Sequence, residues 1–201
     1  MILDAARRIA RAHGWPAVTI RRVADALGYT SPLIYEHFRD KDDALAAILH
    51  EGFGALAAAM AQAAARPVDP ADPDAYVLGV AEAYVAFARA EPAVYRLMHG
   101  MGGVALDPAE TARGAALACE TGVAALEQWA AAAGVALPDP LRATEVLWGA
   151  LHGITTLALA GRLETGDAAH ADALLGDAVG ALLAGWRLRH GGAAAAHTPS
   201  R

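Results

Sequence analysis

The stretch Thr19-Ile-Arg-Arg-Val-Ala-Asp-Ala-Leu-Gly-Tyr-Thr-Ser-Pro-Leu-Ile-Tyr-Glu-His-Phe38 predicts two short helices around a tight turn. Thr19 is a favourable N-cap because its hydroxyl can accept a hydrogen bond from a free amide of the first turn. Gly28 follows the first helix, where a left-handed terminal residue favours glycine. Ser31 is predicted to cap the second helix, and Pro32 then stands at the first helical position, where its missing N–H is not needed. This pattern is typical of a helix-turn-helix, whose second helix enters the major groove of DNA.

The apolar residues of the motif favour the same arrangement. Ile20, Val23, Ala24 and Leu27 recur at helical spacing and form one face of the first helix. Leu33 or Ile34, together with Phe38, would bury the second helix, predicted over residues 31–38, against the first. An ordinary helical hairpin with a capped turn is the alternative interpretation of this stretch.

The remaining side chains of the motif are candidate DNA contacts. The phenol of Tyr35 and the imidazole of His37 are suitable donors to phosphates at the edge of the groove. Glu36 can accept from a cytosine amine or reduce affinity, and Leu33 can touch a thymine methyl. Arg21 is either a phosphate or base contact or a plain surface arginine. The candidate set is Thr19, Arg21, Ser31, Pro32, Leu33, Tyr35, Glu36, His37 and Lys41.

From about Ile2 to about Leu45 the chain resembles the tetracycline-repressor (TetR) family of bacterial transcription regulators. The resemblance is carried by the Ala5-Ala6 first helix, the Gly14-Trp15 break, the motif above and the Lys41-Asp42-x-Ala44-Leu45 start of a long helix. It implies a sequence-specific DNA-binding regulator, most often a ligand-responsive repressor, that acts as a homodimer on a palindromic operator. A helical protein that binds another partner and uses the motif only as scaffold is the alternative.

Composition and charge agree with an all-α protein of this kind. The 201 residues are 56% hydrophobic, but much of that share is alanine, a strong helix former. Residues 1–41 carry seven Lys/Arg and four Asp/Glu, whereas the rest of the chain carries nine and eighteen. Positive charge is therefore concentrated where phosphates would lie. The sequence has no purely apolar segment long enough to predict a membrane span. The single cysteine, Cys119, fits a reducing cytoplasm.

The organisation predicted from the sequence is a three-helix DNA-binding domain followed by a helical-bundle domain for ligand binding and dimerisation. The Pro-rich segment 66–73 and three Asp-Pro pairs mark a break and helix starts. The predicted domains are 1–45, a connecting helix over 46–66, the bundle over 67–189 and a disordered tail over 190–201. Helices outside the motif are expected at 2–13, 41–65, 74–90, 92–100, 108–133, 139–161 and 170–189.

An apolar cavity with a few polar groups is the usual form of a small-molecule site, so the bundle's aromatic residues are candidates for one. The run Trp148-Gly-Ala-Leu-His-Gly153 resembles the "WHG" type of C-terminal domain found in a branch of the family. A plain hydrophobic core is the alternative interpretation of each residue. The candidate lining for an unknown small hydrophobic or aromatic effector is Tyr84, Phe87, Tyr95, Met98, Trp129, Trp148, His152 and Thr155.

A helix-turn-helix that reads a palindrome needs a twofold partner, and the resemblance implies that two helices of each subunit form a four-helix interface. The predicted interface residues are Leu147, Leu151, Leu175, Val179, Leu182 and Trp186.

Enzyme signatures are missing from the sequence. It has no glycine-rich phosphate loop, nucleophile elbow or His-Glu-x-x-His run, and no histidine pair has convincing zinc-ligand spacing. Glu145 and His152 share a helix face two turns apart, where ion-pair or solvent roles explain both. We therefore expect no catalytic residues, metal or cofactor.

Overall fold

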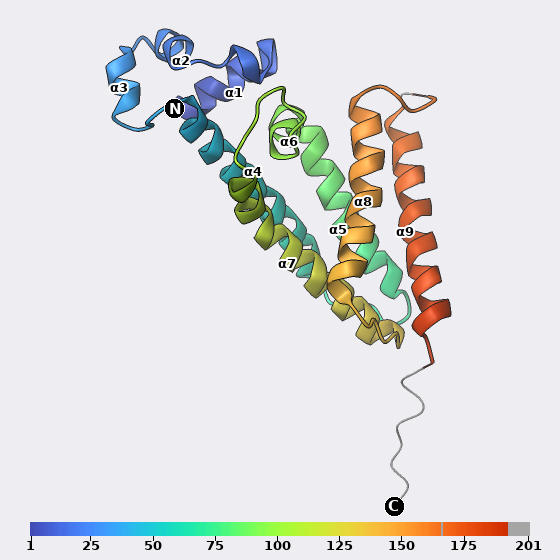
Figure 1. Cartoon of the computed structure of the whole chain (residues 1–201). Coiled ribbons are helices and arrows are strands. Elements are labelled where there is room, and N and C mark those ends of the chain that lie inside the picture. The colour runs from blue at the N-terminus through green and yellow to red at the C-terminus, as the bar shows by residue number, and fades with distance from the viewer. Residues whose placement is uncertain (166, 193–201) are drawn as a thin grey trace, which may run out of the picture. The chain divides into compact units, whose positions relative to one another are not determined.

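The computed structural model describes residues 1–165 and 167–192, and these are folded almost entirely into helices (Figure 1). One isolated antiparallel bridge joins Val135 to Gly191. The all-α prediction is confirmed. The elements are α1 Ile2–His13, η1 Trp15–Ala17, α2 Ile20–Leu27, α3 Ser31–Tyr35, α4 Lys41–Ala64, α5 Pro73–Ala90, α6 Pro92–Met98, α7 Pro108–Ala133, α8 Pro140–Leu159 and α9 Ala168–His190.

Local signals account for where most of these helices begin. Proline is the first residue of α5, α6, α7 and α8, where its fixed φ suits the helix and its missing N–H is not needed. The Asp139 carboxylate accepts from the Arg142 amide at 2.9 Å and caps α8. By length and composition alone α4 could cross a membrane, but half of its most apolar window is buried inside the structure, as in a core helix of a globular protein.

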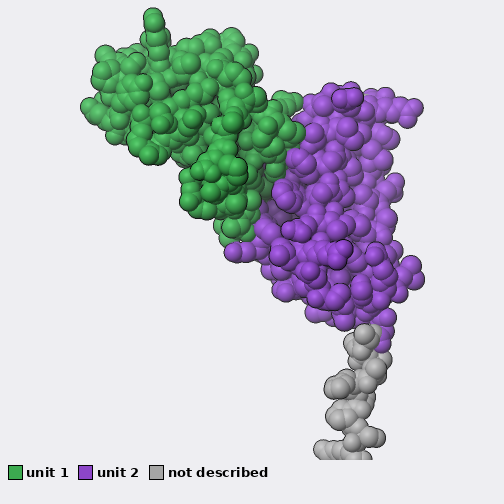
Figure 2. Space-filling view, viewed as in Figure 1, with its two compact units in different colours: residues 1–56, 90–117 green, residues 57–89, 118–201 purple. Residues whose placement is uncertain are grey.

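The chain forms two compact units, each discontinuous in sequence (Figure 2). Unit 1 contains residues 1–56 and 90–117, and unit 2 contains residues 57–89 and the chain from 118 onward. The linear domains predicted from the sequence, 1–45, 46–66 and 67–189, stay a prediction, and these units are grouped differently. Of the predicted disordered tail, 190–201, the part from 193 lies outside the described residues, while α9 continues through His190.

Unit 1 is held together at Trp15, which is 2% exposed. Its indole N–H donates to the Ala93 carbonyl of α6 at 2.8 Å, and its own carbonyl accepts from the Lys41 ammonium at 3.1 Å. A Cβ on Gly102 would lie only 2.9 Å from Trp15 Cδ1, so the loop after α6 needs glycine here to pack on the indole. One residue therefore joins the α1–α2 connection to both α4 and α6, through its backbone carbonyl and its side chain respectively.

Unit 2 has its own core, centred on Trp129 of α7, which is fully buried. The Trp129 indole packs edge-on against Trp186 with ring centroids 6.1 Å apart. Its N–H donates to the Asp74 carboxylate at 2.7 Å, and the Arg187 guanidinium donates to the same carboxylate at 2.5 and 2.7 Å. This network ties α5 and α9 to α7.

Replacing Asp74 by asparagine is expected to destabilise the protein by roughly 1–2 kcal/mol at neutral pH, because Arg187 and Trp129 lose a charged acceptor. The Arg187 guanidinium holds the pKa of Asp74 below its ordinary value. A depressed pKa adds stability above the unfolded-state pKa, and that stability is lost as pH falls through the folded-state pKa. The difference between wild type and Asp74→Asn in urea unfolding should therefore shrink below about pH 4. A difference that stays constant down to pH 3 would contradict this role.

Candidate nucleic-acid interface

The helix-turn-helix forms as its capping residues predict. The Thr19 hydroxyl accepts from the Arg22 amide at 3.2 Å and caps α2. Gly28 ends α2 in the left-handed conformation with φ 68°, and the Tyr29 amide closes the turn on the Ala24 carbonyl at 2.9 Å. Val23 and Ala24 of α2 are buried together with Ile34 of α3, which is 0% exposed. Burial of Ile34 decides which face of α3 turns outward.

The second helix differs from its prediction in two respects. It covers Ser31–Tyr35 instead of 31–38, and the chain continues as a turn through His37, whose amide bonds the Ile34 carbonyl at 3.0 Å. Ser31 was the predicted N-cap, but it is the first helical residue, and Thr30 is the N-cap without a side-chain hydrogen bond. Pro32 is the second helical residue, which still needs no intrahelical donor.

The predicted contact residues of α3 lie mostly at the surface. Tyr35 is 54% exposed, and Pro32, Glu36 and His37 are also exposed, whereas Ser31 and Leu33 are half-buried. The phenol and imidazole are thus accessible to a ligand as large as DNA. Had Tyr35 and His37 been buried, the sequence interpretation would have failed.

The structure divides these residues between two sides of α3. Leu33 and His37 line a hollow of about 650 Å³ with Tyr29, Phe38 and the first turns of α1, and Glu51 of α4 also lines it. Pro32, Tyr35 and Glu36 are not part of this hollow. The side of α3 with Tyr35 is therefore the better candidate for base and phosphate contact, and Leu33 is less available to a thymine methyl than the sequence suggested.

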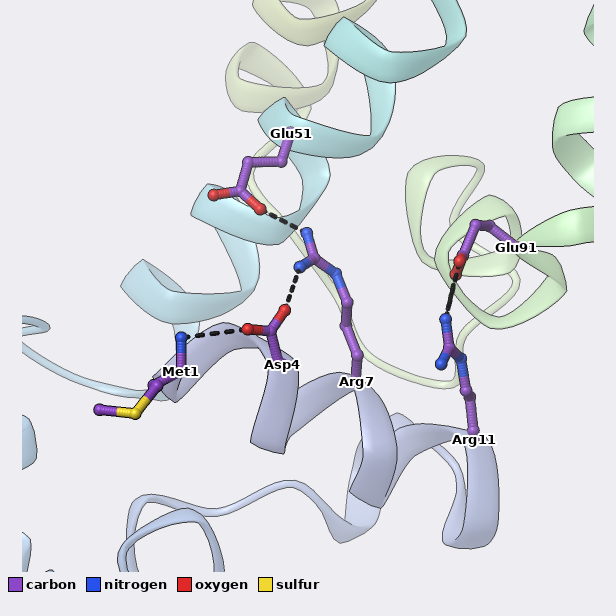
Figure 3. A network of polar contacts seen from close by, with 6 residues as sticks. All are labelled: Met1, Asp4, Arg7, Arg11, Glu51 and Glu91. Atoms are coloured by element: carbon purple, nitrogen blue, oxygen red, sulfur yellow. Dashed lines mark hydrogen bonds and ion pairs between the residues drawn. The ribbon is translucent and has the colours of Figure 1, made fainter. Parts of the chain in front are cut away.

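Charged residues of α1 form ion pairs with α4 and with the residue before α6 (Figure 3). The N-terminal ammonium of Met1 and the Arg7 guanidinium lie 3.0 and 3.1 Å from the Asp4 carboxylate, and Arg7 also pairs with Glu51 of α4. Arg11 donates to both carboxylate oxygens of Glu91, the residue before α6, at 2.7 and 2.6 Å. Arg7 and Arg11 are therefore used in ion pairs within unit 1.

Lys41 and Arg21, the two Lys/Arg residues among the predicted DNA contacts, differ in how firmly their side chains are held. Lys41 is half-buried, and one of its three N–H donors is used by the Trp15 carbonyl, which fixes the position of its ammonium. The Arg21 side chain is 88% exposed and lies 3.9 Å from the Asp25 carboxylate. Arg21 can therefore swing toward a phosphate, whereas Lys41 offers a charge at a set place.

The predicted effector residues do not form one group. Tyr95 and Met98 are fully buried in unit 1, while Tyr84, Trp129 and Thr155 are buried in unit 2. Trp129 is engaged by Asp74, and the Trp148 indole, 43% exposed, donates to the Tyr84 hydroxyl at 3.0 Å.

Two polar side chains of α8 remain of interest for a ligand. The Thr155 hydroxyl is buried and has no hydrogen-bond partner among the described residues. His152 is half-buried, and this burial lowers its pKa. Phe87 of α5 is half-buried as well. Among the described residues no cluster of three His, Cys, Asp or Glu side chains is placed to hold a metal ion.

The predicted dimer residues face inward. Leu182 is half-buried, and the other five are buried within unit 2. They lie on the sides of α8 and α9 that pack on each other and on the core, and they are Leu147, Leu151, Leu175, Val179 and Trp186. The five buried residues expose little surface in the single chain, and the predicted dimer interface stays a prediction. The exposed apolar residues of α8 lie on both edges of its outward side, Leu141 and Trp148 on one edge and Val146 and Leu157 on the other. Two glycines inside one helix, Gly149 and Gly153, were the signal in the sequence for that side.

Two family models match the chain. The model of bacterial regulatory proteins of the tetR family matches residues 2–48, and the model of the tetracyclin repressor-like C-terminal domain matches residues 77–182. Among curated proteins, the HTH-type transcriptional repressor Rv1474c of Mycobacterium tuberculosis is 40% identical over 57 residues. That match covers 28% of this chain and 30% of the relative, so it spans less than a third of the relative's length.

Solved structures share the fold over nearly the whole chain. A Rhodococcus sp. RHA1 protein with unknown function is 24% identical with a TM-score of 0.77, and 92% of this chain and 93% of that chain are covered. PfmR, a TetR family transcriptional regulator from Thermus thermophilus, is 21% identical with a TM-score of 0.65 over 91% and 97%. SmeT, the repressor of the Stenotrophomonas maltophilia multidrug efflux pump SmeDEF, is 20% identical with a TM-score of 0.68 over 92% and 88%.

The turn between α2 and α3 supplies a direct test of the local structure. Gly28→Ala is expected to lower the free energy of unfolding by about 1 kcal/mol, because φ 68° is unfavourable for a residue with a Cβ. No described atom lies within 4 Å of a Cβ at Gly28, so strain in the backbone is the whole cause. Gly54→Ala, at an equally open position inside α4, is the control and should stabilise the protein. Equal effects in thermal unfolding would contradict the assignment.

Proposed function

The chain belongs to the TetR family of bacterial transcriptional regulators, and we propose that it represses transcription as a homodimer on a palindromic operator. Regulators of this family are DNA-binding proteins and not enzymes. The single observation that carries the proposal is the exposed phenol of Tyr35 on a helix whose opposite side is buried through Ile34. A cytoplasmic location belongs to the same proposal, since the operator is chromosomal DNA.

We propose that Tyr35, Glu36 and Pro32 face the groove, with Lys41 and Arg21 on phosphates. Phosphate contacts fix orientation without reading sequence, whereas groups at the base edges discriminate. Ser31 and Thr19 stand at the first turns of α3 and α2, where free amides favour an anion. His37 is exposed at the end of the reading segment and can add a phosphate donor from the hollow side.

Support for the homodimer comes from the outer sides of α8 and α9. Gly149 and Gly153 of α8, and Gly176 and Gly180 of α9, have no described atom within 4 Å of a Cβ position. An interior glycine weakens a helix by about 0.5–1 kcal/mol relative to alanine, so open glycines in mid-helix need another reason. Close approach of a partner helix is such a reason, and we propose that this side of α8 and α9 is the dimer interface.

We propose that a small hydrophobic or aromatic effector binds within unit 2. The buried Thr155 hydroxyl without a described partner supports this, because unsatisfied buried hydroxyls are unfavourable and a ligand can satisfy them. The Tyr84 hydroxyl supplies a further polar group on α5. To release DNA, the effector must bind the released state more tightly than the operator-bound state.

Operator binding can be tested with labelled duplexes that cover the DNA flanking the coding region. We expect Tyr35→Phe to weaken binding about tenfold, because one hydrogen bond to a charged phosphate is lost. Lys41→Met should lower the slope of log affinity against log salt by about 1, since one counterion fewer is released. Fluorescence anisotropy at several salt concentrations measures both.

Tyr76→Phe is the matched control, because that phenol donates to the Ala64 carbonyl within unit 2 and is not part of the helix-turn-helix, so it should leave affinity unchanged. Equal affinity for random duplex would exclude specific readout. A flat salt dependence would instead favour a helical protein that binds a different partner.

The interface can be tested by Gly180→Leu, measured by analytical ultracentrifugation. The single chain has room for the side chain and gains helix propensity, so the variant should fold. A partner helix close to Gly180 would be pushed away, so we expect the protein to become monomeric at micromolar concentration. Ala131→Leu, at an exposed position of α7, is the control and should remain dimeric. A Gly180→Leu protein that sediments as wild type would exclude α9 from the interface.

A further inference from the structure

We propose that two copies of this chain meet along α8 in one register, in which Glu145 of each copy faces the partner's His152 and Trp148 covers the partner's Gly149. The twofold axis then passes between residues 148 and 149. This inference rests on the proposed homodimer and specifies which residues form its centre.

The outer side of α8 has the composition of an interface centre. Leu141 and Trp148 are seven residues apart and lie on one side of α8, where they are 50% and 43% exposed, which is unusual for large apolar side chains. Gly149, the next residue along the helix after Trp148, leaves an open place, with no described atom within 4 Å of its Cβ position. The Trp148 indole donates to the Tyr84 hydroxyl of its own chain at 3.0 Å, and its exposed part stands beside this empty place, so the surface is complementary to a copy of itself.

Twofold symmetry restricts how the surface can meet itself. If residue i of one copy contacts residue j of the other, then j also contacts i. Along two antiparallel helices, i and j therefore add to a constant. When the two residue numbers add to 297, Glu145 lies opposite the partner's His152, and Trp148 lies opposite the partner's Gly149. A shift of one residue brings either the two Trp148 rings or the two Gly149 residues together, and both complementary pairs are lost.

The pairing of Glu145 with the partner's His152 is chemically sound. The two residues are seven apart, so they lie on one side of α8 about 10 Å apart along its axis. Glu145 is exposed, and His152 is half-buried between Trp148 and Thr156, with the two aromatic rings 6.3 Å apart and Thr156 Oγ1 3.5 Å from His152 Nε2. An imidazole N–H can donate to a carboxylate, so each copy supplies one donor and one acceptor.

Cross-linking tests the register directly, in a Cys119→Ser background that removes the native thiol near Glu145. Two differently tagged chains are co-expressed, one with Glu145→Cys and the other with His152→Cys, and are oxidised with copper phenanthroline. We expect a disulfide between the two different tags and little self-linkage of either variant. Glu127→Cys, at an exposed acid of α7, replaces Glu145→Cys in the control and should give no mixed disulfide.

The outcomes separate this inference from the proposal on which it rests. Dimers that form no mixed disulfide, or in which His152→Cys links to itself, overturn the register and leave the homodimer intact. A wild-type protein that sediments as a monomer overturns both.

Gly149→Leu gives a second measurement that does not depend on oxidation. The single chain has room for leucine, so circular dichroism should show a folded helical protein. The side chain would occupy the place of the partner's Trp148, and we expect the dimer dissociation constant to rise about tenfold or more. An unchanged constant in a folded variant overturns the contact between Trp148 and the partner's Gly149.

Discussion

The contact of the Trp15 indole with the Ala93 carbonyl is the constraint on which unit 1 depends. It brings α6, far along the chain, against the connection between α1 and α2, and the Trp15 carbonyl holds Lys41 at the start of α4. A buried indole N–H needs an acceptor, so the bond cannot be given up without cost. Unit 1 therefore includes residues 90–117 as well as the helix-turn-helix, and a shift of α6 acts on the residue that also holds Lys41 of α4.

The ion pairs around α1 extend this arrangement. Arg7 joins α1 to Glu51, and Arg11 joins it to Glu91, so cations that composition alone would assign to DNA are used within unit 1. Each exposed ion pair contributes little to the free energy of unfolding, yet together these pairs link α1 to α4 and to the start of α6. The exposed Arg21 and the fixed Lys41 stay the proposed phosphate contacts beside Tyr35.

In unit 2, much of the apolar surface of the helices is likewise used within the unit. Asp74, Arg187 and Trp129 fasten α5, α7 and α9 to each other, and the packed sides of α8 and α9 complete the core. Leu141 and Trp148 are exposed on one side of α8 beside the open Gly149, a combination whose exposed apolar area contributes nothing to the stability of a lone chain. The proposed dimer and its register explain why such residues stand on the solvent side of a stable helix.

The sequence by itself determined the helices and the reading motif, because their signals are local. Thr19, Gly28 and the prolines at helix starts act on their own turn of backbone, so α2 and the α2–α3 turn are as predicted. Only the tertiary structure decided which side of α8 is buried, since that helix carries apolar residues all round and the pattern cannot say which arc is covered. It also placed Tyr95 and Met98 in unit 1 and put the Lys41 ammonium on a carbonyl, because contacts between distant segments depend on packing that no local signal encodes.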